Sequence, residues 1–179
     1  LLALRGDAAS RPLQLEGPAF SEAADLALLE AAQNGFSLFT AHTLRAMLAW
    51  HRGDIEACWQ ACRQALSVAD NGTGTVLSIE LQVLAALSAP AGEGGAFRDR
   101  LAGWAQVAPA NLQHKLVLVD AVFAARAGRL SDALPQFERA RAAAQAGEFL
   151  RDQVMIEQAC SEALADACTW LAQRTGTAS

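Results

Sequence analysis

The sequence contains no tyrosine, and aromatic residues make up only 6% of its 179 residues. Isoleucine and threonine are few, whereas alanine and leucine dominate a hydrophobic fraction of 53%. Aromatic and β-branched residues favour strands, and Ala and Leu favour helices. The length suits one domain with a continuous core. The composition therefore predicts an all-α protein with little or no sheet.

Basic patches, membrane spans and export signals are also missing. The net charge is −5 and the arginines are dispersed, so nothing suggests an electrostatic footprint for nucleic acid. The most apolar run, 116–127, is too short to cross a bilayer and contains Asp120. Residues 1–5 lack both an initiator Met and the layout of a signal peptide. We expect no nucleic-acid or membrane partner and interpret the chain as a piece of a larger protein.

The four cysteines form no CxxC pair and indicate no disulfide framework, so a reducing cytoplasm is the expected location. Cys58 and Cys62 lie four residues apart, with His51 just before them, and a three-ligand zinc site is conceivable there. The alternative, which we favour, is that both thiols are small core residues. Cys160 and Cys168 have the same interpretation, and we predict no metal or cofactor.

Helix-breaking residues divide the chain into segments with helical periodicity. Ser21, Asp54 and Asn111 precede three of these segments and are predicted N-caps, while Gly147 is expected to end the seventh. A repeat domain over 19–174 would lie between a linker or helix remnant at 1–18 and a linker at 175–179. The predicted helices are 21–33, 36–51, 54–69, 75–88, 97–107, 111–126, 131–146 and 149–173.

Two turn glycines have equivalent surroundings, LAWHRGDIEAC around Gly53 and FAARAGRLSDA around Gly128. Their separation corresponds to about two helix-turn-helix repeats. After each glycine, a tetratricopeptide pattern expects a small, a large and a small residue on one helix face. The matching residues are Ala133, Phe137 and Ala140 after Gly128, and Cys58, Cys62 and Ala65 after Gly53. Cys62 is undersized, and Trp59 is expected to supply the missing volume. The spacing predicts an α-solenoid of about eight antiparallel helices in hairpin pairs.

Residues 17–170 also resemble the helical region of large bacterial and fungal multi-sensor signalling proteins. In that family a Ser/Thr-kinase-like domain and an AAA/STAND ATPase precede the repeats, and a GAF sensor and often a histidine kinase follow. Val122 departs from the family pattern, as do residues 154–156. The residues that carry the resemblance are Trp104, Pro109, Asn111, His114, Lys115, Leu116, Gly128, Ala133, Phe137, Ala140, Ala144, Phe149 and Glu157.

The resemblance implies a non-catalytic scaffold that transmits state between an upstream ATPase or kinase module and downstream sensors. Its partners would be proteins or flanking domains, and ATP would bind elsewhere in the parent. The repeat phase predicts a concave partner-binding face, on which Trp50 would act either as an anchor or as groove filling. His114 and Lys115 could both line this face. The alternative, which we favour, is that His114 packs at a hairpin junction and Lys115 lies in solvent. The predicted face comprises Thr43, Met47, Trp50, Lys115, Val119, Val122 and Arg126.

No catalytic motif occurs in the chain. There is no nucleophile elbow, and NGTGT at 71–75 lacks the Gly-Lys-Ser/Thr of a phosphate-binding loop. Two alternatives remain open. One is the helical region of a LuxR/maltose-activator-type transcription regulator, whose groove would bind an inducer. The other is a thiol or zinc enzyme using Cys58 and Cys62.

Overall fold

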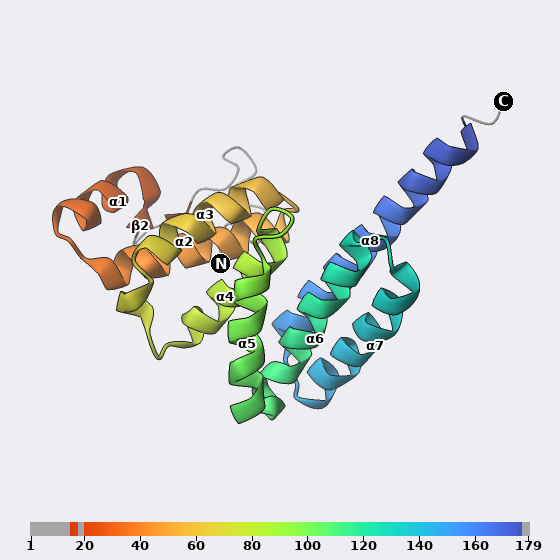
Figure 1. Ribbon diagram of the computed structural model, residues 1–179. Coiled ribbons are helices and arrows are strands. Elements are labelled where there is room, and N and C mark those ends of the chain that lie inside the picture. The colour runs from red at the N-terminus through yellow and green to blue at the C-terminus, as the bar shows by residue number, and fades with distance from the viewer. Residues whose placement is uncertain (1–14, 18–19, 177–179) are drawn as a thin grey trace. The chain divides into compact units, whose positions relative to one another are not determined.

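The computed structural model describes residues 15–17 and 20–176 and is helical almost throughout (Figure 1). The exception is a pair of two-residue antiparallel strands, β1 (Glu16–Gly17) and β2 (Phe20–Ser21). The predicted all-α class is confirmed. Most of the predicted N-terminal linker lies outside the described residues.

The described residues contain eight α-helices, as many as the sequence predicts, and one short 3-10 helix, η2 (Ala69–Gly72). The last helix continues to Gly176, so the start of the predicted C-terminal linker is helical, and 177–179 lie outside the described residues. The helices are α1 (Glu22–Ala31), α2 (Gly35–His51), α3 (Ile55–Ser67), α4 (Val76–Ser88), α5 (Gly95–Val107), α6 (Pro109–Arg126), α7 (Leu130–Ala146) and α8 (Leu150–Gly176).

The stretch predicted as one repeat domain contains two compact units, one ending at Phe97 and one beginning at Arg98. In the first unit, α3 packs against α2, α4 contacts both of them, and α1 packs on α2. In the second unit, α7 packs against α6, and α8 contacts both (Figure 1). Each unit thus has a helix pair with the following helix laid against both of its members.

Small side chains fill the contacts within each helix pair. Ala133, Phe137 and Ala140 on α7 are 0% exposed, which confirms the burial predicted from their spacing after Gly128. The corresponding residues of α3 are equally buried, namely Cys58, Cys62 and Ala65. Trp59 is half-buried and its ring meets that of Phe97 edge-on, with centroids 6.1 Å apart. Close helix approach through small residues is therefore common to both units.

One turn geometry recurs where α1, α2, α6 and α7 end. A residue with positive φ follows each helix, in order Gln33, Gly53, Gly128 and Glu148. At the third turn, the Gly128 amide donates to the Ala125 carbonyl at 2.9 Å, and the Arg129 amide donates to the Ala124 carbonyl at 2.9 Å. This pair of hydrogen bonds is the Schellman motif, which satisfies the last carbonyls of a helix and reverses the chain. Sequence reasoning found the two turns with Gly in the left-handed position.

The N-caps follow the prediction in part. Asp54 caps α3 by accepting from the Ala57 amide at 2.9 Å, as predicted. Asn34, which was not among the predicted caps, accepts from the Ser37 amide at 3.1 Å through its side chain and caps α2. Ser21 precedes α1 but makes no side-chain cap bond. Its own amide instead donates to the Asp25 carboxylate at 2.7 Å.

The predicted cap at Asn111 is wrong, because α6 begins two residues earlier at Pro109. Proline has no amide hydrogen to lose and has a helical φ, so the first position of a helix suits it. Asn111 therefore lies inside the first turn of α6, and Ala108 occupies the cap position.

Candidate functional site

The residues predicted to contact a partner differ in exposure. Met47 is half-buried and Arg126, at the end of α6, is exposed. The other predicted residues are buried, namely Thr43, Trp50, Lys115, Val119 and Val122. Partner contact through these positions stays a prediction, and only Met47 and Arg126 present an accessible side chain here.

An accessible stripe runs along α2 beside the predicted positions. We call Phe36, Thr40, Leu44, Met47 and His51 the α2 stripe. These residues recur every three or four positions, so they share one helix face. Phe36 is 52% exposed and Leu44 is 41% exposed, whereas the other three are half-buried. The periodicity could have identified this face. The prediction from the repeat pattern instead selected Thr43, which lies one residue before the exposed Leu44.

A buried polar cluster lies where α8 meets α6, and the turn after α7 positions it. Gly147 leaves room there for the ring of Phe149, since an added Cβ would lie 2.3 Å from the ring atom Cε2. Phe149 stacks on the His114 imidazole with centroids 4.4 Å apart and 17° between the planes. Gly147 also follows the last residue of α7, as predicted. Glu148 has the positive φ, of 57°, while Gly147 is needed for space.

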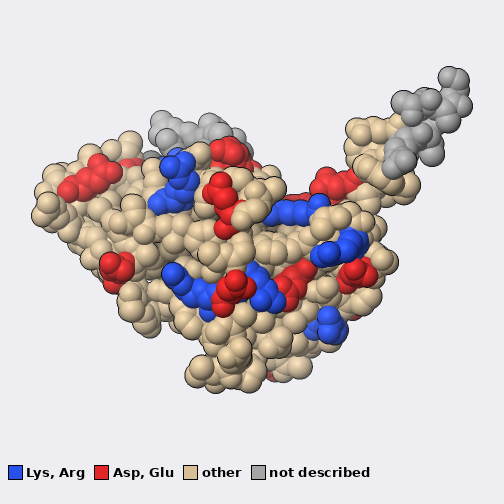
Figure 2. Space-filling view, viewed as in Figure 1, with Lys and Arg blue, Asp and Glu red and all other residues tan. Residues whose placement is uncertain are grey.

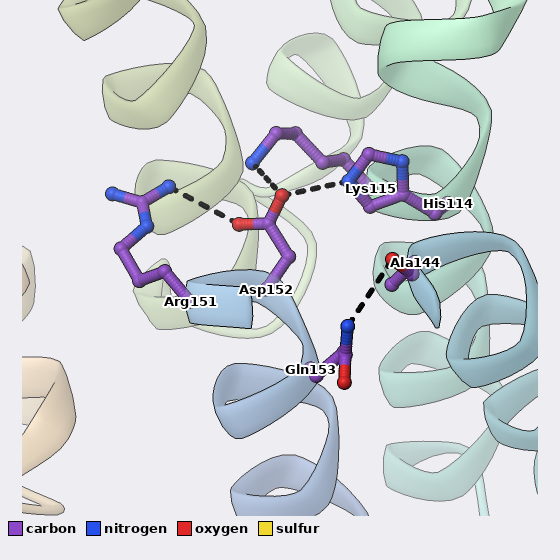
Figure 3. Close-up of polar contacts among 6 residues, drawn as sticks. All are labelled: His114, Lys115, Ala144, Arg151, Asp152 and Gln153. Atoms are coloured by element: carbon purple, nitrogen blue, oxygen red, sulfur yellow. Dashed lines mark hydrogen bonds and ion pairs between the residues drawn. The ribbon is translucent and has the colours of Figure 1, made fainter. Parts of the chain in front are cut away.

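The carboxylate of Asp152, in the first turn of α8, is the centre of this cluster (Figure 3). Its Oδ2 lies 2.7 Å from His114 Nε2 and 2.7 Å from Lys115 Nζ. Its Oδ1 accepts from the Arg151 guanidinium at 3.2 Å. We call these four residues the Asp152 cluster. Lys115 is only 7% exposed, so the expectation that it lies in solvent is wrong, whereas His114 packs as expected.

Electrostatics keep Asp152 ionised despite its burial. Burial alone would raise the pKa of this carboxyl. The hydrogen bond with His114 and the charges of Lys115 and Arg151 outweigh that effect and hold the pKa of Asp152 well below its usual range. A carboxylate with three close partners is a poor proton acceptor. We therefore interpret the Asp152 cluster as a polar connection between α6 and α8.

The thiols of Cys58 and Cys62 are both 0% exposed. The hydrogen bond between the two thiols, followed by burial, raises the pKa of Cys62, which disfavours its thiolate. The same hydrogen bond lowers the pKa of Cys58. Ser88 Oγ lies 3.9 Å from Cys62 Sγ. Within residues 15–17 and 20–176, no three His, Cys, Asp or Glu side chains gather in a way that could hold a metal ion.

Charges of both signs are interspersed over the face seen in Figure 2. The ion pairs on α5 and α7 fit this mixed pattern. Arg98 bonds to Asp120 with Nε 2.8 Å from Oδ1, and Arg141 Nε lies 2.6 Å from a Glu157 carboxylate oxygen. The expectation of no nucleic-acid partner remains a prediction. None of the described helices combines the length and apolar character needed to cross a membrane.

Comparisons with family models, with curated proteins and with solved structures found no match. The resemblance to multi-sensor signalling proteins therefore stays a prediction. What the chain's own structure defines is a helical protein with two compact units, a partly exposed stripe on α2 with two exposed apolar residues, and a buried polar cluster between α6 and α8.

Proposed function

We propose that this chain is a TPR-like α-solenoid segment that acts as a non-catalytic scaffold for interaction and interdomain coupling. Its parent would be a large ATP-binding signal-transduction kinase of the AAA/STAND, GAF and histidine-kinase type. The partner would be another protein or a flanking domain of the same chain. The parent context rests on the sequence resemblance alone.

The observation that carries the proposal is that the helices of the two units pack in the same arrangement. In each unit a helix pair is followed by a helix that contacts both members, α4 on α2 and α3, and α8 on α6 and α7. Repeat arrays build their cores in this way, because each new helix buries a face that one pair leaves open. The buried small residues after Gly53 and Gly128 support the same interpretation.

The α2 stripe supplies the surface for a partner. Phe36 and Leu44 expose apolar side chains that are no part of the core. When an amphipathic helix binds in a groove of another protein, its apolar anchors recur every three or four residues, which is the spacing of the stripe. The stripe is therefore the surface that we expect to contact a protein, in place of the buried positions predicted from sequence.

Site-specific photo-crosslinking in the intact parent protein tests this proposal. A benzoylphenylalanine in place of Leu44 is the probe, and one in place of Arg63, an exposed residue of α3, is the matched control. We expect position 44 to crosslink reproducibly to one protein segment, identified by mass spectrometry, and position 63 to give far less of that product. Phe36→Glu should suppress the product without changing the folded helix content.

Equal crosslinking from positions 44 and 63, or none from position 44, would contradict the scaffold proposal. Protection of position 44 by a small inducer molecule, with no protein product, would instead favour the transcription-regulator alternative. Both probe positions are exposed, Leu44 to 41%, so each probe is accessible to a partner.

A further inference from the structure

A second exposed face lies along α8, and its residues recur at alternating intervals of four and three positions. This spacing places them on one side of the helix and is the heptad spacing by which two helices pair. Leu150 is 73% exposed, Val154 is 58% exposed and Leu164 is 42% exposed, and Cys168 is exposed as well. We call this face the α8 stripe, which comprises Leu150, Val154, Glu157, Ser161, Leu164 and Cys168.

The α8 stripe is distinct from the face of α8 that belongs to the core of the second unit. Met155, Ile156 and Ala159 form that core face and are at most 3% exposed. Successive residues of a helix are rotated by about 100°, so these three residues lie on the side of α8 opposite Leu150 and Val154. Figure 1 shows that α8 also continues past the ends of α6 and α7. The stripe is therefore accessible to a further helix.

The order of residues along the stripe is symmetric. Two polar side chains in its middle are flanked on each side by two apolar ones, with the final cysteine counted as a small hydrophobic residue. A dimer with two-fold symmetry needs such a self-complementary surface. In an antiparallel pair of α8 helices, Leu150 faces the partner's Cys168 and Val154 faces the partner's Leu164. Apolar positions thus meet apolar positions at both ends of the stripe.

The polar residues of the stripe favour the antiparallel direction. In that direction Glu157 faces the partner's Ser161, whose hydroxyl can donate to the carboxylate. A parallel pair in register would set Glu157 against the partner's Glu157, and like charges repel. The Glu157 charge is also balanced within its own chain by Arg141, whose Nε lies 2.6 Å from the carboxylate. Beside the stripe, Arg151 comes opposite the partner's Ala165, so this flank adds no like-charge contact.

We propose that two copies of this chain associate through their α8 stripes, which pair antiparallel about a two-fold axis. The α2 stripe takes no part in this contact, so the dimer does not depend on the proposed scaffold role. A single helix pair buries less area than the roughly 1,200 Å² from which stable interfaces begin, so the dimer is weak and reversible. We expect it to form at concentrations of about 10–100 μM, in the range of weak association.

Disulfide formation in the full chain tests both the contact and its direction. Leu150→Cys places a thiol opposite the partner's Cys168, and dithiodipyridine accepts the two electrons and two protons that the thiols give up as their S–S bond forms. We expect a covalent dimer on non-reducing gels. A bond within one chain is excluded because positions 150 and 168 lie about 27 Å apart along the helix, whereas disulfide-bonded Cα atoms lie within about 7 Å.

Two matched controls carry only one of these two thiols. The wild-type chain has Cys168 alone, and Leu150→Cys combined with Cys168→Ser has the thiol at position 150 alone. Equal positions of the two copies lie far apart in the antiparallel dimer, so neither control should give the covalent dimer. A covalent dimer of either control at the level of Leu150→Cys indicates parallel or random contact and overturns the proposal.

Sedimentation velocity of the reduced chain measures the association without a covalent bond. Leu164→Glu should weaken it by at least about tenfold, because each dimer loses two apolar contacts. Val76→Glu, at a 71% exposed position of α4, is the matched control and should leave the association unchanged. A wild-type chain that stays monomeric up to about 500 μM, or a Leu164→Glu chain that associates as the wild type does, overturns the proposal.

Discussion

At the residue scale, the same residue type, glycine, is favoured at two positions for different physical reasons. Gly128 has a φ of 74° and nothing within 4 Å of an added Cβ, so its backbone conformation is what favours glycine. Gly147 has an ordinary φ of −92°, but an added Cβ would collide with Phe149. Both positions favour glycine, one because of the torsion and the other because of the neighbouring ring.

Two alanine substitutions separate these causes. Gly128→Ala should lower the free energy of unfolding by about 1–2 kcal/mol, the cost of a left-handed non-glycine residue. Gly147→Ala should cost about 1–3 kcal/mol by overpacking and should also move the Phe149 ring from His114. Urea denaturation measures both energies, and the His114 ring resonances report the movement. An unchanged His114 environment in Gly147→Ala would contradict the steric explanation.

The Asp152 cluster allows a second test at this scale. Asp152→Ala leaves the buried Lys115 ammonium without its carboxylate, and removing one partner of a buried pair typically costs about 3–5 kcal/mol. Glu157→Ala breaks the ion pair between Glu157 and Arg141. Because the Glu157 side chain is 55% exposed, the loss should cost less than about 1 kcal/mol. Similar losses of stability by urea denaturation would mean that the cluster connects the helices no more strongly than a surface pair.

At the scale of the helix, the cap bonds decide where an element begins. Asp54 accepts a backbone bond at the start of α3, whereas Ser21 holds the same position before α1 without one. Both residue types favour N-caps, so residue type alone does not distinguish them. At the start of α1 the polar contact is instead between the Ser21 amide, which donates, and the Asp25 carboxylate, which accepts.

Alanine substitution at these two caps should therefore give unequal results. We expect Asp54→Ala to lower the free energy of unfolding by about 1 kcal/mol, the usual value of a lost cap. Ser21→Ala, which removes no side-chain cap bond, should cost less than Asp54→Ala. Thermal unfolding by circular dichroism compares the two variants. A larger effect of Ser21→Ala would show that its hydroxyl contributes to α1.

At the scale of the whole molecule, acid stability reflects buried carboxylates. The pKa of Asp152 is lower in the folded chain than its ordinary value of 3.8, so its contribution is present above about that pH and is lost as the pH falls further. We expect the wild-type chain to lose stability steeply below about pH 4. Asp152→Asn should lose less with acidification from a lower starting stability. An unchanged acid slope in this variant, measured by urea denaturation at several pH values, would assign the acid sensitivity to other groups.

The all-helical class, the number of helices and the buried small residues after Gly53 and Gly128 followed from the sequence. These features depend on helix propensity and on a periodicity of three or four residues, which are local properties. The ends of α1 and α7 were also predicted, but the left-handed torsions of Gln33 and Glu148 were not, because neither residue type signals one.

Tertiary structure alone decided the sites. Asp152 lies 38 residues from His114, and no periodicity connects positions so far apart. The burial of Trp50 and the accessibility of Leu44 depend on which neighbouring helices cover each side of α2. Periodicity within a helix fixes which residues share a face, but only the packed neighbours determine which face is left to the solvent.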